Sequence, residues 1–442
     1  MQKIKCLVCF YLIFSTKSDS ILTIRRNIML SLDYIRNNKA KVQEMLHNRN
    51  DDIDLERLLD LDSKYRTELS KLEALLASKN AISKKPTPEE IARMKMVKQE
   101  IANLQESVQN IKEDRDYLLY RMPNMLDERV PVGADDHDNL AIKFVGEKRK
   151  FDFEPKWHDD LGRALGILNT EAGAKVAGAG FVYWRGDGAR LLTAIMNFAL
   201  DTLISRGFCQ MFTPILAKED TFFGTGYLPF AQDQLYTVTA EKKSLIGTSE
   251  QTLLSYEQNN VVDLSKGPIL YTAWTPCFRT EAGAYGKETR GVFRVHQFNK
   301  VEQIVICKPE DSEKYHQFCL ENEEYLLQQL GIPYRVVNVC TGDLGAPAAI
   351  KYDIEGWFPA YGDYRELTSN SNLWEYQARR LNIKYLNEKG GKNEFVHTIS
   401  ATAITERAML AVIENNQNAD GSVNIPECLQ KYMGGQKVIC KK

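Results

Sequence analysis

The sequence predicts an α+β protein that carries a separate pair of long antiparallel helices near its N-terminus. Two observations lead to this prediction. Residues 54–117 contain no glycine, and their apolar residues recur at spacings of three and four, as in a coiled coil. The later part of the chain mixes strand-like and helical segments without the regular strand–helix alternation of a parallel sheet. A chain of 442 residues is long enough for two or three domains.

Composition excludes several classes of protein. With 43% hydrophobic and 26% charged residues, the chain has an ordinary globular composition. A formal net charge of −2 argues against a surface covered in nucleic-acid-binding charge but allows one local basic patch. The nine cysteines are scattered, and the only Cys-x-x-Cys pair is Cys6 and Cys9, so we expect neither disulfides nor zinc. This cysteine usage favours a reducing compartment, and we expect a cytoplasmic protein.

The first 28 residues contain lysines followed by the apolar run "CLVCFYLIF", which resembles a weak secretion signal. The run is too short to span a bilayer as a helix, and no cleavage site is convincing. Met29 directly precedes a well-patterned helix. We therefore expect residues 1–28 to be an appendage or an upstream start, with an export signal as the alternative, and no membrane partner.

Residues 29–135 are predicted to form a helical domain that contains the two long helices. The segment "SKKPTPEE" separates them, with Thr87 as a cap, Pro88 at the first helical position and Glu90 completing a capping box. The two helices must therefore reverse direction there and pair antiparallel. The predicted seam consists of Leu58, Leu61, Tyr65, Leu69, Leu72 and Leu76 on one helix, and Ile91, Met94, Val97, Ile101, Leu104, Val108 and Ile111 on the other.

The tip of this arm is basic, because residues 77–98 hold six Lys or Arg and two Glu. A slender arm with a positive end suits a phosphate backbone. A hairpin that only mediates protein contacts, or a solvated charged face, is the alternative. The residues expected to bind nucleic acid are Lys84, Lys85, Arg93, Lys95 and Lys98.

Residues 136–442 are predicted to form the mixed domain, with helices near 185–206, 311–330 and 402–415. The segment "FRTEAGAYGKETRGVFRVHQFNKVE", residues 278–302, is expected to form two strands around a glycine-rich loop. If it is extended, Arg279 and Glu281 lie side by side on one face. Taken alone, a solvated charged hairpin is the better interpretation. Neither a Walker-type phosphate loop nor a complete G-x-G-x-x-G is present.

Other motifs in the same chain argue against a merely solvated charged hairpin at residues 278–302. "GFCQMFTPIL", "FRTE" with "GVFRVHQFNKVE", "ELTSNSNLWEYQARR" and "HTISATAITERAMLAVIENNQ" resemble the signature motifs of class II aminoacyl-tRNA synthetases. Together with "VPVG", "RGDGARL", "GTGYLP" and "LIGTSE", in that order, the pattern is similar to the seryl-tRNA synthetases, from Met29 to the C-terminus. The resemblance implies an antiparallel-sheet catalytic domain, a tRNA-binding arm and a homodimer formed through the first motif, which Gly207 and Pro214 fit.

The activity implied by this resemblance is ligation of serine to tRNA. L-Serine and ATP would give seryl-adenylate and pyrophosphate, and transfer to tRNA(Ser), with tRNA(Sec) as a further acceptor, would release AMP. One alternative is a synthetase-like ligase that passes the activated amino acid to a carrier protein, but such relatives usually lack the arm. Another is a non-catalytic paralogue that binds tRNA, in which loss of Arg279, Glu281 or Arg407 would be expected. A pure coiled-coil interaction protein would not need the C-terminal 300 residues.

The resemblance also assigns the nucleotide site. Arg279 would contact the α-phosphate and the amino-acid carboxylate, Arg407 the γ-phosphate and the far face of the adenine, and Phe298 would stack on the adenine. Arginine suits these positions because it is always charged and grips phosphate in bidentate fashion. Glu366 and Ser369 would bind Mg²⁺, whose preferred ligands are oxygens, although Glu366 alone could be a surface carboxylate. The implied ATP-binding residues are Arg279, Thr280, Glu281, Val295, Phe298, Glu366, Leu367, Thr368, Ser369 and Arg407, and Arg279 and Arg407 are the implied catalytic residues.

Serine selection requires an acceptor for the ammonium group and partners for the hydroxyl. The implied serine-binding residues are Thr248, Ser249, Glu250, Arg279, Glu302, Ser400 and Thr402. His296 is expected to be structural, because adenylate formation needs no general base from the protein. The sequence departs from the family pattern at two positions, where Ser400 replaces the usual asparagine and Glu406 replaces a small residue or proline. Either departure could alter specificity or rate.

Overall fold

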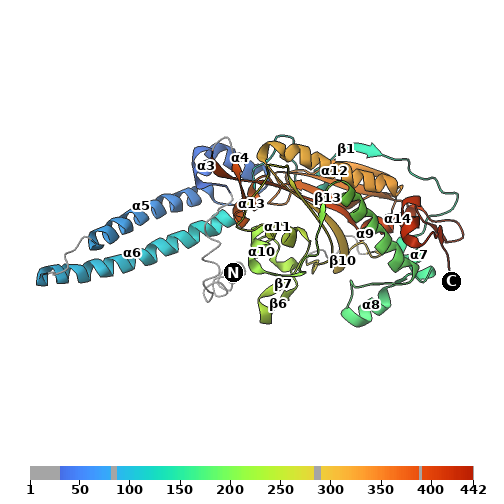
Figure 1. Cartoon of the computed structure of the whole chain (residues 1–442), viewed down its shortest axis with the longest axis horizontal. Helices are drawn as coiled ribbons and strands as arrows, with labels where there is room; N and C mark the ends of the chain where they lie inside the picture. The colour runs from blue at the N-terminus through green and yellow to red at the C-terminus, as the bar shows by residue number, and fades with distance from the viewer. Residues whose placement is uncertain (1–29, 81–86, 283–289, 388–390, 442) are drawn as a thin grey trace. The chain divides into compact units, whose positions relative to one another are not determined.

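The computed structural model describes residues 30–80, 87–282, 290–387 and 391–441, which form two compact units, residues 30–125 and 126–441 (Figure 1). The expected appendage at residues 1–28 and the predicted tip residues Lys84 and Lys85 lie outside the described residues. Residues 126–135 belong to the second unit, whereas the sequence predicts that they belong with the helices. They are held there by backbone hydrogen bonds, from Asp127 N to Ala349 O at 3.0 Å and from Thr341 N to Pro131 O at 2.9 Å.

The first unit consists of four helices. These are α3 (Leu32–Asn37), α4 (Lys39–Asn48), α5 (Leu55–Asn80) and α6 (Pro88–Arg121). Ser31 caps α3 by accepting a hydrogen bond from Tyr34 N at 3.0 Å. The two long helices α5 and α6 pack along each other (Figure 1), and α6 begins at Pro88, as predicted.

The middle of the seam between α5 and α6 agrees with the prediction and adds Leu75, while the side chain of the predicted Ile91 lies outside the described residues. Leu72, Ile101 and Val108 are buried, and Tyr65, Leu69, Leu75, Leu76, Val97 and Leu104 pack partly buried around them. The pairing is antiparallel, because Arg115 near the end of α6 lies 3.7 Å from Asp62 near the start of α5. The guanidinium of Arg115 also lies 4.1 Å from the centre of the Tyr65 ring. The predicted helical hairpin is therefore confirmed.

The second unit is built on an eight-stranded sheet with the order β1-β11-β12-β13-β16-β10-β9-β4. All neighbouring pairs are antiparallel except β4 and β9. This confirms the predicted α+β class. The strands are β1 (Leu140–Val145), β4 (Cys209–Gln210), β9 (Ile269–Phe278), β10 (Gln297–Cys307), β11 (Tyr334–Asn338), β12 (Ile350–Phe358), β13 (Asp363–Asn372) and β16 (His397–Thr405).

One face of the sheet is covered by helices, mainly α9 (Asp187–Ser205) and α12 (Ser312–Gln329), with α14 (Glu406–Asn415) packed beside α9 (Figure 1). Val301 and Val305 of β10 point to this face and belong to the main hydrophobic core. Because alternate strand residues point to opposite faces, Lys300 and Glu302 point to the other face. Helix α14 starts at Glu406 rather than near residue 402, because the preceding residues continue β16.

Smaller elements complete the second unit. The helices are α7 (His158–Ala164), α8 (Thr170–Ala177), α10 (Glu219–Gly224), α11 (Glu250–Ser255), α13 (Tyr376–Leu381) and α15 (Glu427–Gln430), with short 3₁₀ turns at Asp136–Asp138, Gln232–Gln234, Thr239–Glu241, Pro309–Asp311 and Lys431–Met433. The strands are β2 (Leu168–Asn169), β3 (Tyr183–Trp184), β5 (Leu216–Lys218), β6 (Thr237–Val238), β7 (Lys243–Leu245), β8 (Val261–Val262), β14 (Lys384–Asn387), β15 (Lys392–Phe395), β17 (Val423–Asn424) and β18 (Val438–Ile439). Within the described part of the chain, none of the helices has the length and apolar composition of a membrane span.

Candidate active site

A cavity of about 640 Å³ lies on the face of the main sheet that α9 and α12 leave open. It brings together most of the predicted ATP- and serine-binding residues, although these are spread over 160 positions of the sequence. Its lining includes Thr248, Glu250, Arg279, Glu281, Val295, Phe298, Glu302, Glu366, Leu367, Thr368, Ser369, Ser400, Thr402 and Arg407.

Two predicted residues lie outside this lining. Ser249 is fully buried at the start of α11. Thr280 is a neighbour of Arg279 in sequence, but its hydroxyl donates to the carbonyl of Asp233 at 2.5 Å. The structure therefore places both beside the cavity rather than in its wall.

Arg279 enters the cavity directly after β9. Its backbone N–H donates to His296 O at 3.0 Å, and its Nε donates to Gly247 O at 3.3 Å. The guanidinium carbon lies 5.4 Å from the centre of the Phe298 ring. His296 supports this geometry, because its Nδ1 lies 3.1 Å from the Arg279 carbonyl and so donates to it.

Glu281 reaches the same cavity by a different route from the one predicted. Strand β9 ends at Phe278, and Glu281 has a left-handed backbone with φ of 52°. Arg279 and Glu281 are thus not alternate residues of one strand. The Glu281 carboxylate accepts from Arg294 at 2.5 Å instead, and this ion pair joins the two sides of the glycine-rich loop.

Arg407 approaches from the first turn of α14. Its guanidinium lies 3.3 Å from the Glu366 carboxylate and donates to the Glu366 carbonyl at 3.2 Å. Its other neighbour is the ring of Phe293, whose centre is 4.4 Å away. The Glu366 side chain is 51% exposed. Its partial removal from water would raise its pKa, but the positive charges of Arg407 and Lys351 outweigh this effect and hold the pKa below its usual value. Glu366 is therefore an ionised carboxylate at neutral pH.

A bulge in β13 explains how Glu366 and Ser369 both face the cavity. Thr368 pairs with Ile354, whereas Glu366 pairs with Glu355, so one extra residue lies between them. Thr368 points to the helical face, where its hydroxyl donates to Glu323 at 2.7 Å. Glu366 and Ser369, on either side of Leu367 and Thr368, therefore project together into the cavity.

Ser369 lies opposite a residue that the sequence did not single out. Its cross-strand partner on β12 is Asp353, whose carboxylate lies 3.1 Å from Lys351 Nζ. Burial raises the pKa of Asp353 to about 6, although Lys351 acts against this rise. The Asp353–Lys351 ion pair thus lies on the strand next to Ser369.

Glu302 is the centre of a buried polar group at the inner end of the cavity. Only 2% of the residue is exposed. Thr248 Oγ1 donates to Glu302 Oε2 at 3.1 Å, and Lys300 Nζ forms an ion pair with the same oxygen. Thr402 is the cross-strand partner of Glu302, and its hydroxyl accepts from Lys300 Nζ at 3.4 Å. Burial raises the pKa of Glu302 to about 7, helped by Glu250 and opposed by Lys300.

Sequence reasoning missed several other residues of the site. Strand alternation alone could have found Lys300, because it lies two residues before Glu302 on the same face. Tyr227 belongs to "GTGYLP", which was noted without a role for any residue, and it lines the cavity together with Phe293. Phe293 belongs to the quoted motif "GVFRVHQFNKVE", in which it was given no role.

A buried histidine supports the chain just before Phe293. His158 Nε2 accepts from Val292 N at 3.3 Å, so its Nδ1 carries the proton and donates to Glu414 at 2.7 Å. Gly291 has φ of 79°, and an added Cβ would lie 2.5 Å from His158 Nε2. The absence of a side chain at Gly291 therefore permits this close approach.

The two departures from the family pattern also lie at the cavity. Ser400 lines it from β16. Glu406 accepts hydrogen bonds from Asn299 N at 2.8 Å, Asn299 Nδ2 at 2.6 Å and Trp184 Nε1 at 3.2 Å. The side chain of Glu406 is therefore directed at β10 and β3.

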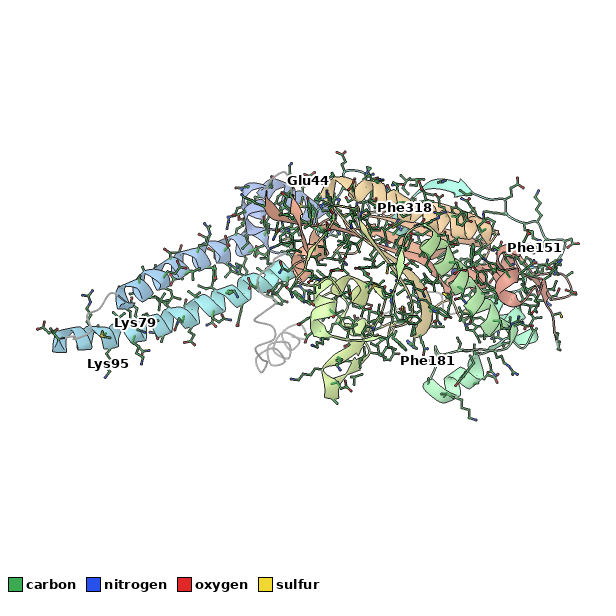
Figure 2. All side chains as sticks on the ribbon, in the orientation of Figure 1. Glu44, Lys79, Lys95, Phe151, Phe181 and Phe318 are labelled. Atoms are coloured by element: carbon green, nitrogen blue, oxygen red, sulfur yellow. The ribbon has the colours of Figure 1, made fainter. Side chains whose placement is uncertain are left out.

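The predicted nucleic-acid-binding residues belong to the helical unit. Arg93, Lys95 and Lys98 are exposed on α6. Figure 2 shows Lys79 and Lys95 projecting from α5 and α6. Since Lys84 and Lys85 are not described, the structure gives the positive tip only in part.

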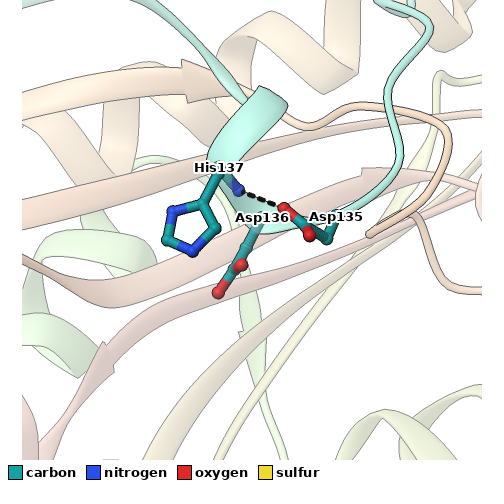
Figure 3. Close-up of side chains that lie close together, drawn as sticks. All are labelled: Asp135, Asp136 and His137. Carbon is teal, nitrogen blue, oxygen red and sulfur yellow. Dashed lines mark hydrogen bonds between the residues drawn. The ribbon is translucent and has the colours of Figure 1, made fainter.

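One exposed group elsewhere brings three possible metal ligands together. The side chains of Asp135, Asp136 and His137 lie within 4.8 Å of one another (Figure 3). Asp135 accepts from His137 N at 3.0 Å (Figure 3), which is the hydrogen bond of a helix cap. None of the three lines the cavity, and local turn geometry accounts for their proximity.

Comparison with known proteins places both units of the chain. Residues 29–126 match the model of the seryl-tRNA synthetase N-terminal domain. Residues 236–416 match the tRNA synthetase class II core domain of the G, H, P, S and T enzymes. The serine--tRNA ligase of Listeria welshimeri is 41% identical over 423 residues, which cover 93% of this chain and 99% of that protein.

Solved structures agree with these matches. The seryl-tRNA synthetase of Pyrococcus horikoshii, crystallised with ATP, superposes with a TM-score of 0.87 at 38% identity and covers 94% of this chain and 100% of that chain. The cytoplasmic serine-tRNA ligase of Naegleria fowleri, in complex with AMP, gives a TM-score of 0.84 at 35% identity with the same coverage.

Proposed function

This chain belongs to the seryl-tRNA synthetase family, and from that premise we propose that it activates L-serine with ATP and transfers the seryl group to tRNA(Ser). The observation that supports this most directly is the buried Glu302, with Thr248, Lys300 and Thr402 around it. Lys300 and Thr248 both contact one oxygen of this buried carboxylate, Oε2. The other oxygen is then available at the inner end of the cavity to accept a hydrogen bond from the hydroxyl of a small amino acid.

In the activation step the serine carboxylate attacks the α-phosphorus of ATP. The bond to pyrophosphate breaks, and a mixed anhydride, seryl-adenylate, forms. Two anions must approach each other, so a fixed cation at the reacting phosphoryl group contributes most. We assign that role to Arg279, whose backbone and Nε are held by His296 and Gly247.

The nucleotide base would lie between Phe298 and Arg407. Phe298 offers an aromatic face on the β10 side, and Arg407 offers a planar cation from α14. Glu281 and the backbone of Val295 would meet the edge of the base, and Thr280, Leu367 and Thr368 would contribute backbone or supporting contacts. Arg407 is also close enough to Glu366 to bridge the base side and the phosphate side.

Mg²⁺ fits the residues on the phosphate side. The ionised Glu366 and the hydroxyl of Ser369 are oxygen donors that line the same cavity. Asp353 lies opposite Ser369 on β12; there it would accept a hydrogen bond from the Ser369 hydroxyl and leave the lone pairs of that hydroxyl free for a cation. When bound, Mg²⁺ would neutralise charge on the phosphate oxygens.

Serine would bind with its hydroxyl toward Glu302 and Thr402 and its ammonium toward Glu250 and Thr248. Ser249 would support this segment from behind, because it begins α11. Ser400 would contact the substrate through one hydroxyl where the family usually has an amide. A site built to hydrogen-bond a hydroxyl rejects an analogue lacking it by about 10⁴-fold or more, since its buried groups are then unpaired.

Transfer to tRNA requires a second binding surface, and we assign it to the helical arm. The exposed Arg93, Lys95 and Lys98 of α6, together with Lys84 and Lys85, would contact the phosphate backbone. The same contacts with the phosphate backbone would bind tRNA(Sec), which the enzyme would also charge with serine. An alternative acceptor, such as a carrier protein, is less favoured because it gives the basic arm no role.

We further propose a homodimer that works in the cytoplasm. The sheet ends at the two-residue strand β4, and Phe212 just after it is 94% exposed. An aromatic residue so exposed beside an open sheet edge suits contact with a second copy. The described cysteines are all free thiols, which suits the reducing compartment where translation occurs.

The direct test is amino-acid-dependent exchange of pyrophosphate into ATP, measured across the twenty amino acids. We expect exchange with serine and poor exchange with threonine, alanine and glycine. Equal exchange with alanine would contradict the serine assignment. Charging of a tRNA(Ser) transcript then tests the second step, and normal activation without charging would favour the alternative acceptor.

A further inference from the structure

We propose that Glu406 is a positioning residue that sets the width of the adenine slot by joining the start of α14 to β10. The inference rests on the proposed function, because that function assigns the adenine to the space between Phe298 and Arg407. Phe298 directly precedes Asn299, which Glu406 binds, and Arg407 directly follows Glu406.

Both carboxylate oxygens of Glu406 accept hydrogen bonds. One oxygen accepts both N–H groups of Asn299, at 2.8 Å from the backbone and 2.6 Å from the side chain. The other accepts from Trp184 Nε1 at 3.2 Å. The residue is 8% exposed, and among the described basic residues none forms an ion pair with it. A buried carboxylate with only N–H donors is stable only where the donors are fixed.

The donors at Asn299 and Trp184 are fixed by the fold. Asn299 belongs to β10, and its side-chain oxygen accepts from Trp274 Nε1 at 2.9 Å. That contact determines which end of the amide faces Glu406. Trp184 belongs to β3 and packs against the main hydrophobic core. Glu406 thus joins segments that lie 107 and 222 residues away in sequence.

Glu406 also provides an acceptor for a backbone N–H at the end of the β10–β16 ladder. The pairing of β10 with β16 ends at Lys300 and Thr405, and the partner of Asn299 on the other side is Pro276. The N–H of Asn299 therefore needs an acceptor where β16 turns into α14. The Glu406 carboxylate accepts this N–H, so the hydrogen bonding of the sheet continues one residue further through a side chain.

The consequence is a fixed spacing between the two sides of the slot. Phe298 lies on β10, to which Glu406 is hydrogen-bonded, and Arg407 follows Glu406 in the first turn of α14. On its other side, Arg407 is held by Glu366 and by the Phe293 ring. Without the Glu406 contacts, the first turn of α14 would lose its hydrogen bonds to β10, and the β16 ladder and the shared hydrophobic core would remain as its connections to that strand.

A purely structural role is the competing explanation, because an acid in the first turn of a helix also stabilises that helix. The two explanations differ in what they change. A positioning role changes affinity for ATP and leaves affinity for serine nearly untouched, since Glu302 is held by its own contacts with Thr248 and Lys300 and by the pairing of β10 with β16. A structural role lowers stability and changes neither affinity selectively.

The experiment compares Glu406→Ala, Glu406→Gln, Trp184→Phe and the double variant Trp184→Phe/Glu406→Gln. ATP affinity is measured by calorimetry without serine or tRNA, and the KM values for ATP and for serine come from pyrophosphate exchange. We expect Glu406→Ala to weaken ATP binding about tenfold or more, because small misplacements of binding groups are costly. The KM for serine should stay within about threefold.

Glu406→Gln provides the sharper comparison. Its amide oxygen can still accept from Asn299, but its NH₂ group must then face the Trp184 Nε1–H, so donor meets donor. We expect an intermediate loss of ATP affinity. Trp184→Phe removes the opposing donor, so the double variant should bind ATP within about twofold of Trp184→Phe alone. Glu427→Ala, which removes an exposed acid from the first turn of α15, is the matched control and should bind ATP as the wild type does.

Wild-type ATP affinity in folded Glu406→Ala would overturn the inference. Parallel losses in both KM values together with lower stability would also overturn it. If Glu406→Ala does not fold, the Glu406→Gln comparison decides, and failure of Trp184→Phe to restore ATP affinity counts against the proposal. A wild-type protein that binds ATP but shows no serine-dependent exchange would refute the proposed function, while the ATP-binding comparison would still stand.

Discussion

Glu302→Gln tests the serine pocket most directly, because it removes one charge and keeps the shape of the side chain. In the wild type, one carboxylate oxygen accepts from Thr248 and pairs with Lys300. The serine hydroxyl would donate to this carboxylate. A hydrogen bond to a charged group contributes about 1.5–3 kcal/mol, against about 0.5–1.5 kcal/mol for a neutral pair. The substitution should therefore remove roughly 1–2 kcal/mol of binding to serine.

That difference corresponds to a fall of about 5- to 30-fold in kcat/KM for serine, since about 1.4 kcal/mol is a factor of ten. Alanine has no hydroxyl to lose, so its kcat/KM should change little. The measured quantity is the ratio of the two values in pyrophosphate exchange. The substitution also leaves Lys300 buried without its partner, and we expect the free energy of unfolding to fall by about 3 kcal/mol.

The same variant gives a prediction about pH. Burial raises the pKa of Glu302 to about 7, so its carboxylate is ionised above this pH and protonated below it. In the wild type, kcat/KM for serine should fall as the pH drops below 7 and level off about 5- to 30-fold lower, near the value for Glu302→Gln, since the protonated form offers the hydroxyl only a neutral partner. In Glu302→Gln this decline should disappear.

Glu257→Gln is the matched control for both measurements. Glu257 is another buried acid of the same unit, 7% exposed, and it accepts from the Tyr271 hydroxyl at 2.6 Å. It does not line the cavity. We expect Glu257→Gln to lower stability without changing the serine-to-alanine ratio. An unchanged ratio and an unchanged acid decline in Glu302→Gln would refute the role given to Glu302.

The remaining predictions concern activation, specificity and tRNA. Arg279→Ala should lower serine-dependent exchange by about 10³-fold or more with the fold intact by circular dichroism; activity within tenfold of wild type would rule out its contact with the reacting phosphoryl group. Ser400→Asn should leave exchange with serine intact or raise it, and complete loss would mean that the pocket selects another substrate. Replacing residues 68–110 by a short Gly/Ser linker retains the Asp62–Arg115 pair and should preserve exchange while lowering tRNA charging by orders of magnitude; normal charging would make the arm a structural hairpin. In the intact protein, tRNA affinity should fall steeply with salt, and exchange should depend on salt much less.

Local patterns in the sequence determined the elements of this protein and most members of its site. The three- and four-residue spacing predicted the α5–α6 seam around Leu72 and Ile101, because a helix brings such residues to one face whatever surrounds it. The order of the short motifs identified the family and, through it, Arg279, Glu302, Glu366 and Arg407. None of these predictions needed the position of one segment relative to another.

The tertiary structure alone decided which side chains meet. The bulge in β13 turns Glu366 and Ser369 to the same side, and a left-handed residue rather than a strand brings Glu281 into the cavity. Asp353 lies opposite Ser369 only because β12 and β13 pair in one register.

Glu406 shows the difference most clearly. In the sequence it is a departure from a motif, whereas in the fold it accepts hydrogen bonds from residues 107 and 222 positions away. Helix and strand patterns depend on neighbours within a few residues, so the sequence displays them directly. Contacts between distant segments depend on strand register and on the ends of strands, which are fixed only when the whole sheet has formed and its core is packed.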